Sequence, residues 1–328
     1  MFTFAAIKKM NDLLILKTKK MRTLKSVLIV LCVVVMASCQ CDKKSCCGHA
    51  KDACNKNIGL QMYSLRDPIA TKSIGIDSVI TAIGGMGYKY VENFGYNGSD
   101  GTTFGYSPKD LKDKFAAVGV TILSTHVRQD LPGKKTDANM AELWKWWDKC
   151  IADHKAMGAK YIVMPSMPTP ETLSELKEYC EYYNALGAKC LEAGMKFGYH
   201  NHSFEFETHY PMDNGSEISM YDYMVRNTDP AKVFFELDVY WSNMGRRAPV
   251  ELFEAYPGRF EILHIKDSKE LGRSGFVGFD AIFNNIDKAG TKYLIVEVEN
   301  YNMPPIKSVK ESLDYLNHAD FVKTDYAQ

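Results

Sequence analysis

The sequence predicts a single (β/α)8 barrel, a TIM barrel of the α/β class, and three observations lead to this prediction. Eight short hydrophobic runs rich in β-favouring residues alternate with longer segments of helical length or spacing. The helical segments often stop at a glycine just before the next run. About 270 residues remain from position 58 onward, which suits one barrel of roughly 250 residues better than two separate cores.

The predicted strands follow one another in the order expected of repeated strand and helix units. We expect them at residues 59–63, 90–94, 121–126, 161–164, 196–202, 233–238, 260–266 and 293–299. Glycine at a helix end accepts the left-handed backbone that returns the chain to a strand. The predicted helix ends are Gly87, Gly119, Gly158, Gly194, Gly258 and Gly290.

The helical segments carry few signs of function. Three tryptophans lie in the helix expected at 138–157, where packing against the barrel wall is favoured over a partner surface. They are Trp144, Trp146 and Trp147. The next helix, 171–193, is long enough to be split or kinked. We expect buried or free thiols at Cys150, Cys180 and Cys190, and surface histidines at His154, His209 and His318.

Two loops could form part of the mouth. The glycine-rich loop 95–106 has no lysine or arginine, so it is a poor phosphate cradle and a better mobile rim. The loop 271–279 lies where barrels often bind phosphate, but its single Arg273 is a weak signal.

Residues 1–38 are expected to be an upstream extension and a lipoprotein signal peptide. Arg22 and Lys25 precede an apolar run over 27–36, and small residues then lead to Cys39. The run is too short for a membrane-spanning helix of roughly 20 residues, which disfavours an uncleaved anchor. The pattern resembles a bacterial lipoprotein signal, in which cleavage before Cys39 leaves that thiol to carry the lipid. Met21 would be a second start that gives a signal of ordinary length.

Residues 39–57 are expected to tether the lipid to a catalytic barrel at 58–328. Besides Cys39, four cysteines crowd this segment and could bind a metal or form disulfides, but the adjacent Cys46 and Cys47 match no zinc spacing. We therefore expect an exported protein on the periplasmic or outer-membrane face of a bacterium, held to the membrane only through Cys39.

Charge balance favours a small-molecule partner. Forty basic and forty acidic side chains cancel, so no net field attracts nucleic acid or an anionic surface.

Alternation along the last four strands directs ionisable side chains into the barrel. They are His200 and His202, Glu236 and Asp238, His264 and Lys266, and Glu297 and Glu299. In the eighth strand Ile295 shares this face, whereas Leu294 and Val296 point to the helices. Unpaired charge in this position would be costly to bury.

A divalent cation would offset that cost. Two carboxylates and two imidazoles supply mixed nitrogen and oxygen ligands that suit manganese, cobalt, zinc or iron. We expect Asp238, His264 and Glu297 as ligands, with His200 and His202 as equal candidates for the fourth.

Separate salt bridges in a solvated mouth are the alternative, for instance Lys266 with Glu299. His126, at the end of the third strand, is also expected to be functional because barrel strand ends usually carry the chemistry.

The order of strand-end motifs resembles a known family. YHNHSFEF, FELDVYW, LHIKD and IVEVEN follow one another as in the sugar phosphate isomerase/epimerase family, the xylose isomerase-like barrels. The resemblance extends from 58 to about 321 and includes QMYSLR at 61–66 and YVENFG at 90–95. The motifs are specific as a set, although each is weak alone.

The resemblance implies one divalent metal ion, manganese, cobalt, zinc or magnesium, held by Glu, Asp, His and Glu from strands five to eight. The last three fall on Asp238, His264 and Glu297, whereas the first falls on His200. This histidine replaces one of the two glutamates that epimerases use to move a proton, so one of the two proton carriers would have to be His200, His202 or Lys266.

The resemblance also implies a carbohydrate substrate and roles for several residues. The expected catalytic residues are Glu297, as base or metal-bound carboxylate, with His202, Lys266 and His126. The expected sugar-binding residues are Glu92, His126, Trp241, Lys266 and Glu299. For Trp241, ordinary packing is an equal alternative to stacking on a sugar ring.

Three functions follow from these expectations. The first is a metal-dependent isomerase or epimerase that removes a proton α to the carbonyl of a keto-sugar through an enediolate. The second, similar to inosose dehydratases, is a lyase or dehydratase that eliminates β to the ketone of a 3-keto-glycoside. The third is a sugar-binding lipoprotein without catalysis. An endonuclease of a related barrel is disfavoured, because its three-metal site needs more histidines and a basic groove.

Overall fold

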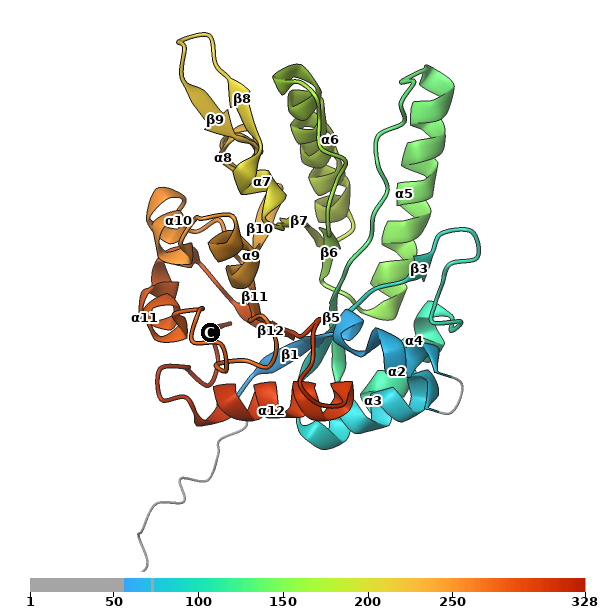
Figure 1. The fold of residues 1–328 in the computed structure, drawn as a ribbon. Helices are drawn as coiled ribbons and strands as arrows, with labels where there is room; N and C mark the ends of the chain where they lie inside the picture. The colour runs from blue at the N-terminus through green and yellow to red at the C-terminus, as the bar shows by residue number, and fades with distance from the viewer. Residues whose placement is uncertain (1–55, 72–73, 328) are drawn as a thin grey trace, which may run out of the picture. The chain divides into compact units, whose positions relative to one another are not determined.

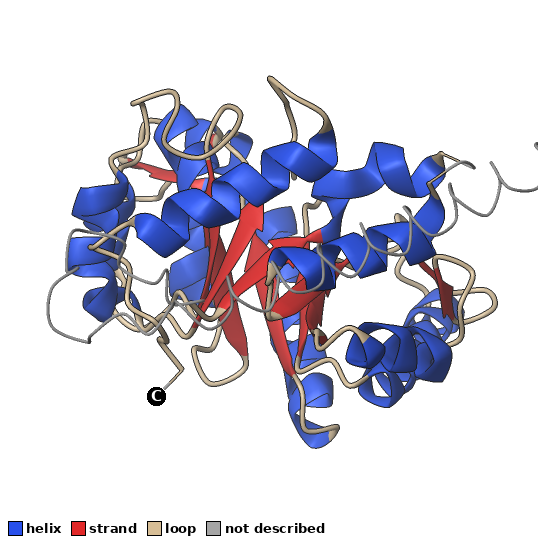
Figure 2. Ribbon diagram, turned by 90° about the horizontal axis from the view of Figure 1, so that it is seen from below, coloured by secondary structure: helices blue, strands red, loops and turns tan. Residues whose placement is uncertain are grey.

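The computed structural model describes residues 56–71 and 74–327, and it confirms the predicted TIM barrel. Eight parallel strands form one sheet in the order β5, β2, β1, β12, β11, β10, β7 and β6. They are β1 (Ile58–Gln61), β2 (Tyr90–Asn93), β5 (Thr121–Thr125), β6 (Tyr161–Met164), β7 (Lys196–His200), β10 (Val233–Asp238), β11 (Ile262–Lys266) and β12 (Tyr293–Glu297). Figure 1 labels these strands, and Figure 2 shows them at the centre of a ring of helices.

The two ends of the sheet meet between β5 and β6, so that the barrel is nearly closed. His126 forms a parallel bridge with Val163 just beyond the end of β5. The Val127 N–H donates to the Val163 carbonyl at 2.9 Å, and the Lys160 N–H donates to the Leu123 carbonyl at 2.8 Å. His126 is thereby held at the mouth by backbone contacts with both neighbouring strands.

Helices cover the outside of the barrel. The longer ones are α3 (Gly75–Met86), α4 (Pro108–Ala117), α5 (Asp137–Met157), α6 (Leu173–Glu192), α8 (Met220–Asn227), α10 (Pro249–Ala255), α11 (Phe279–Ala289) and α12 (Pro305–His318). Short elements lie in the loops: η1 (Met62–Leu65), α2 (Arg66–Ala70), α7 (Phe204–Glu207), α9 (Val239–Met244), the β3 (Tyr96–Asn97) and β4 (Thr102–Thr103) pair, and the β8 (His209–Pro211) and β9 (Glu217–Ser219) pair. The helix α6 is one continuous element, so the segment that was long enough to be split is not split.

The local sequence explains where several helices begin and end. The Thr136 hydroxyl accepts the Asn139 N–H at the start of α5, and the Thr172 hydroxyl accepts the Glu175 N–H at the start of α6, both at 3.2 Å. All six predicted helix-end glycines have φ between 74° and 98°, which confirms the left-handed ends.

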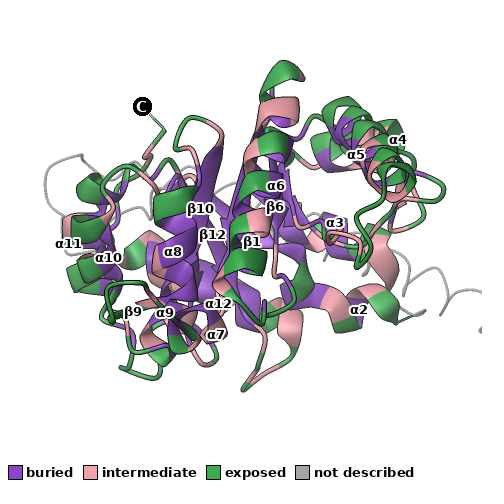
Figure 3. Cartoon of the chain, turned by 90° about the horizontal axis from the view of Figure 1, so that it is seen from above, coloured by how far each residue is buried: buried purple, intermediate pink, exposed green. Residues whose placement is uncertain are grey.

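Two apolar layers confirm the predicted alternation. The inner layer fills the barrel below its mouth and comprises Tyr90, Leu123, Tyr161, Val163, Phe234, Ile262 and Ile295. The outer layer lies between strands and helices and includes Leu294 and Val296. Seen from above, the strands are buried and the helices expose their outer faces (Figure 3). Glycine in two strands makes room for the inner rings, because a Cβ at Gly198 would lie 2.5 Å from the Phe234 ring.

Three strands end two residues earlier than predicted. The chain turns into η1 after Gln61, β7 ends at His200, and β12 ends at Glu297. His202 and Glu299 therefore lie just beyond the strand ends rather than within the strands.

The predicted signal, the lipidated Cys39 and most of the tether lie outside the described residues. The described residues, 56–71 and 74–327, belong to one compact unit by their internal contacts. Within these two ranges, no helix has both the length and the hydropathy needed to cross a membrane.

The prediction that His154 is a surface group is wrong, whereas His209 and His318 are exposed as expected. His154 lies on the inner face of α5 and is fully buried, with its Nδ1 2.7 Å from the Cys150 carbonyl. Trp147 is also fully buried on this face and donates to the Tyr182 hydroxyl at 2.5 Å, which confirms packing as its role. The three expected thiols are free and buried.

We predict that His154 makes the protein less stable below pH 6.5. Burial lowers the pKa of His154 from 6.5 to about 4, so between these values the unfolded chain binds a proton that the folded chain does not. The free energy of unfolding should therefore rise with pH across this window, by about 3 kcal/mol for this one group. Denaturant unfolding at several pH values between pH 4 and pH 7 would measure this dependence. The free energy of unfolding of His154→Gln should rise less steeply with pH than that of the unsubstituted protein. The exposed His318→Gln is the matched control, and equal slopes in all three proteins would refute the prediction.

Candidate metal centre and active site

Ionisable side chains meet inside the carboxyl end of the barrel, as alternation predicts. The four strands β7, β10, β11 and β12 contribute His200, Glu236, Asp238, His264, Lys266 and Glu297. All six are at most 5% exposed, directly above the apolar inner layer. Buried charges of this density need partners or a cation, so their pairing reveals the chemistry of the site.

An upper group of four side chains has the arrangement of a metal centre. His200, Asp238, His264 and Glu297 each offer one ligand atom, and these atoms all lie within 4.8 Å of one another. Asp238 Oδ2 and His264 Nδ1 are buried and make no hydrogen bond, although His264 Nδ1 lies 3.5 Å from Glu297 Oε2. Two carboxylates and two imidazoles suit a divalent cation, which would satisfy both unpartnered atoms. The residues present therefore fit the expected metal.

Local structure aims the free oxygen of Asp238 at this group. Asp238 ends β10 and caps α9, where its Oδ1 accepts the N–H groups of Tyr240 at 2.9 Å and Trp241 at 2.8 Å. Asn201 holds the same backbone, because its Oδ1 accepts the Asp238 N–H at 3.0 Å and its Nδ2 donates to the Asp238 carbonyl at 3.3 Å. Burial raises the pKa of Asp238 to about 7, and the nearby Lys266 opposes this shift.

The geometry favours His200 over His202 as the fourth ligand. His200 ends β7, is 2% exposed and lies within reach of the other three groups. His202 lies two residues beyond it, outside the upper group, with a buried Nδ1 that has no hydrogen-bond partner. Its backbone N–H donates to Glu205 Oε2 at 2.8 Å, which fixes the turn after β7.

A lower group of carboxylates and imidazoles lies on the other side of the His264 ring. His126 Nε2 is 2.9 Å from Glu92 Oε1 and 2.8 Å from Glu236 Oε2. His264 Nε2 is 2.7 Å from Glu92 Oε1 and 3.2 Å from Glu236 Oε2. A ligating histidine usually donates its other N–H to a carboxylate, which fixes its tautomer. These carboxylates therefore leave Nδ1 of His264 free to act as a ligand.

The lower group is a less suitable cation site than the upper one. His126, His200, Glu236 and His264 also offer ligand atoms within 4.8 Å of one another. However, Glu236 Oε2 already lies 2.8–3.2 Å from a nitrogen of each of the three histidines. A cation in the lower group would break these contacts and give a partner to one unsatisfied atom, Glu236 Oε1, whereas a cation in the upper group would give partners to two.

Sequence reasoning missed four residues that support the site. Glu236 was placed on the inward face by alternation but given no role, and Asn201 shares the HNH motif with the two histidines. Gln61 donates to Glu92 Oε1 at 2.7 Å, and the Ser124 hydroxyl donates to Glu92 Oε2. Gln61 and Ser124 lie at or near the ends of β1 and β5, the one sequence signal that could have identified them.

Lys266 binds Glu297, at the end of β12, and Glu299, two residues beyond it. Its Nζ is 2.9 Å from Glu297 Oε2 and also bonds Glu299 Oε2. Burial would raise the pKa of Glu297, but Lys266 and His264 hold it well below its usual value. The expected salt bridge of Lys266 with Glu299 thus exists beside the metal-ligand arrangement rather than instead of it.

Three predicted sugar-binding residues, Glu92, Trp241 and Lys266, are not among the residues that line the cavity above the upper group. Glu92 is fully buried among its partners in the lower group. Trp241 has its ring 5.3 Å from Lys266 Nζ and 5.6 Å from the His202 ring. Contact of the three side chains with a sugar stays a prediction, and their surroundings favour positioning for Glu92 and packing for Trp241.

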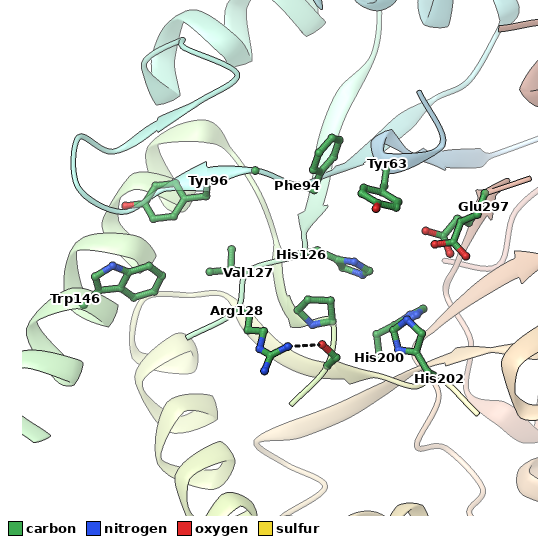
Figure 4. Close-up of a pocket in the computed structure, with 14 residues that line it drawn as sticks. Tyr63, Phe94, Tyr96, His126, Val127, Arg128, Trp146, His200, His202 and Glu297 are labelled. Atoms are coloured by element: carbon green, nitrogen blue, oxygen red, sulfur yellow. Dashed lines mark hydrogen bonds between the residues drawn. The ribbon is translucent and has the colours of Figure 1, made fainter. Parts of the chain in front are cut away.

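A cavity of about 460 Å³ opens above the upper group (Figure 4). Its walls include predicted site residues from three sides of the mouth. The residues that line the cavity are Tyr63, Phe94, Gly95, Tyr96, His126, Val127, Arg128, Trp146, Pro165, Ser166, His200, His202, Glu297 and Glu299. Five of the ten predicted site residues therefore face one cavity, while Asp238, His264 and Lys266 lie buried beneath it.

Comparisons with known proteins agree with this architecture. The family model described as xylose isomerase-like TIM barrel matches residues 80–319. A crystal structure of a sugar phosphate isomerase/epimerase from Parabacteroides distasonis is 32% identical with a TM-score of 0.76, covering 84% of this chain and 98% of that one. A zinc-containing crystal structure of an IolI protein has a TM-score of 0.61 at 15% identity, covering 83% of this chain and all of that one, and this likeness concerns the fold alone.

An inosose dehydratase from Geobacillus kaustophilus is 24% identical over 207 residues, which are 58% of this chain and 61% of the relative. The chain thus matches less than two thirds of that protein's length. The family match and the extent of the structural likeness confirm the resemblance carried by the strand-end motifs. This chain belongs to the xylose isomerase-like TIM barrel family, together with the sugar phosphate isomerases/epimerases.

Proposed function

We propose that this protein is a divalent-metal-dependent enzyme that removes a proton α to the carbonyl of a keto-sugar or sugar derivative. One observation carries the proposal. Asp238 Oδ2 and His264 Nδ1 lie buried and unpartnered beside His200 and Glu297, at the floor of a cavity in a barrel whose relatives process sugars.

The upper group would hold the cation. His200, Asp238, His264 and Glu297 are the proposed ligands, and the zinc in the IolI structure makes zinc one of the metals to test, with manganese, cobalt and magnesium. A bound cation would polarise the ketone and stabilise the negative charge that develops as the α-proton leaves. Lys266 keeps Glu297 ionised, which suits that carboxylate to ligation.

His202 and His126 are the proposed proton carriers. Both line the cavity, and His202 presents an Nδ1 without a hydrogen-bond partner. Burial lowers the pKa of His202 to about 4, so its imidazole is neutral near pH 7 and can accept a proton. Burial would also lower the pKa of His126, but Glu92 and Glu236 raise it to about 9, so this ring can donate one. Opposite shifts in two groups that face one cavity are typical of an acid and base pair.

Two reactions share this first step. In isomerisation or epimerisation, the enediolate regains a proton and keeps its carbon skeleton. In elimination, the α-C–H and β-C–O bonds break, a C=C bond forms, and the leaving oxygen takes a proton from the acid. The histidine at position 200, where epimerases have glutamate, and the inosose dehydratase match both support the elimination as a second candidate.

We also propose that the enzyme is exported and tethered to a membrane through a lipid on Cys39, as the basic, apolar and small-residue pattern before this cysteine predicts. A sugar-binding lipoprotein without catalysis remains the third candidate, and turnover separates it from the other two.

Incubation of keto-sugars and 3-keto-glycosides with metal-loaded protein in heavy water tests the reaction. Isomerisation should give a product with deuterium at an α-carbon and the skeleton retained, whereas elimination should release the aglycone. Mass spectrometry and NMR of the products distinguish the two outcomes. A protein that neither binds zinc, manganese or cobalt nor exchanges the α-proton would refute the proposal.

Glu297→Gln should abolish turnover while preserving the fold. The amide keeps the shape of the side chain but loses the negative charge that pairs with Lys266 and would bind the metal, so we expect a loss of at least about a hundredfold in kcat/KM. Circular dichroism would monitor folding. Glu207→Gln, at an exposed glutamate in α7, is the control. Near-normal activity of Glu297→Gln would remove this residue from the mechanism.

His202→Gln should lower kcat by roughly 10²–10⁴-fold with the bound metal retained, because it removes a proton carrier and no proposed ligand. Metal analysis and steady-state kinetics of the same preparation measure both quantities. His200→Gln is the matched comparison and should lose metal as well as activity. Metal loss in His202→Gln alone would reverse the assignment of the two histidines.

A further inference from the structure

The cavity above the proposed metal centre has two unlike walls. One is ionisable and consists of His126, His200, His202, Glu297 and Glu299. The other is aromatic and consists of Tyr63, Phe94, Tyr96 and Trp146. In Figure 4, Tyr96 and Trp146 lie at the opposite end of the cavity from Glu297, and His126 lies between them. The proposed reaction uses only the ionisable wall, so the aromatic wall needs another explanation.

The aromatic wall is held in place by its neighbours. Phe94 meets Tyr63 edge to face with centroids 5.2 Å apart, and Tyr96 meets Trp146 in the same way at 5.8 Å. The Tyr96 hydroxyl donates to Asp153 Oδ2 at 2.6 Å. Ring pairs of this geometry fix one another and add to the stability of the wall.

A glycine in the loop between β3 and β4 makes room for the tryptophan. A Cβ at Gly98 would lie 2.2 Å from Trp146 Nε1, so no other residue fits there without moving the indole. None of the four rings is fully buried, and Tyr63 is 40% exposed. The wall thus presents preformed apolar ring surface to the cavity.

The charges around the cavity do not suit a phosphate. Arg128 is the one lysine or arginine among the lining residues of the described chain, and its guanidinium is paired with Asp130 at 2.9–3.1 Å. Lys266, which lies buried beneath the cavity, forms ion pairs with Glu297 and Glu299. Glu297 and Glu299 would repel an anion, and among the described residues that line the cavity no unpaired lysine or arginine offsets them, which leaves the proposed metal as the cation that could attract one.

The size of the cavity allows more than one ring. Its volume of about 460 Å³ lies in the range of roughly 300–1,000 Å³ of pockets that enclose drug-sized ligands. Because Tyr96 and Trp146 lie at the far end of the cavity from Glu297 (Figure 4), a single sugar bound at the upper group would leave that end unfilled.

We propose that this site takes an uncharged glycoside of two rings. The ketone-bearing sugar lies against the ionisable wall, and the second ring lies with its apolar face on Trp146 and its aromatic neighbours. This inference rests on the proposed function, because it assigns the reacting ring to the upper group. A second sugar and an aryl aglycone offer the same flat apolar face, so the test includes both.

The experiment measures binding without turnover. Glucosides, galactosides and mannosides lack a ketone and cannot enolise, so their affinities are independent of whether the proposed reaction takes place. Isothermal titration calorimetry with zinc-loaded protein would compare each methyl glycoside with its phenyl counterpart and with the corresponding disaccharide. Glucose 6-phosphate serves as the anionic probe.

At least one phenyl glycoside or disaccharide should bind about tenfold more tightly than its methyl counterpart, since ring stacking adds to buried apolar area. Trp146→Ala should remove this preference. Trp144→Ala is the matched control, because Trp144 lies on the same helix and packs on Tyr182 and Lys189 outside the cavity. Tyr63→Ala should weaken the preference as well. Because the Tyr63 ring is exposed, this variant tests the aromatic wall even if Trp146→Ala does not fold.

Equal affinity within every pair, preference for the phosphate, or no binding of any glycoside would overturn the two-ring assignment. A preference that survives both Trp146→Ala and Tyr63→Ala would also overturn it. Loss of α-proton exchange with this preference intact would instead contradict the proposed reaction alone.

Discussion

The site depends on the contacts that the buried imidazole of His264 makes with two carboxylates. Its Nε2 faces Glu92 and Glu236 at 2.7 and 3.2 Å, which leaves Nδ1 toward Asp238 and Glu297. A buried ring nitrogen without a hydrogen bond is costly, and so is the unpartnered Asp238 oxygen beside it. The proposed divalent cation would satisfy both atoms and would offset the cost of so many ionisable groups above an apolar layer.

The barrel therefore divides into levels with different tasks. Phe234, Ile262 and Ile295 fill the interior and give the strands a fixed base. The lower carboxylates orient the histidines, and the upper group offers its free atoms to a cation. The cavity above places His126 and His202 beside any bound sugar. The fully buried Glu92 and Glu236 thus position the histidines that line the cavity.

Much of this arrangement follows from local rules of the sequence. A two-residue period placed Asp238, His264 and Glu297 on one face, because strand geometry alone determines which side chains point inward. The glycines that end the helices could be predicted equally well from the sequence. The ends of the strands were harder to predict. The turn after His200 depends on the hydrogen bonds of Glu205 with the His202 backbone and of Asn201 with the Asp238 backbone.

Contacts between distant segments explain what the sequence left open. Gln61 and Ser124 reach Glu92 only once the barrel brings β1, β2 and β5 together. His154 was misplaced although it follows Trp147 and Cys150 at helical spacing on the buried face of α5, a pattern that favoured the core. The aromatic wall likewise joins residues from two loops, those after β1 and β2, and from the helix α5.

Anomalous diffraction from crystals soaked in manganese tests the central claim most directly. The account predicts one peak in the upper group, bonded by Asp238 Oδ2 and His264 Nδ1 with His200 and Glu297. A peak on the Nε2 side of His264 between Glu92 and Glu236, or no peak within the barrel, would contradict it.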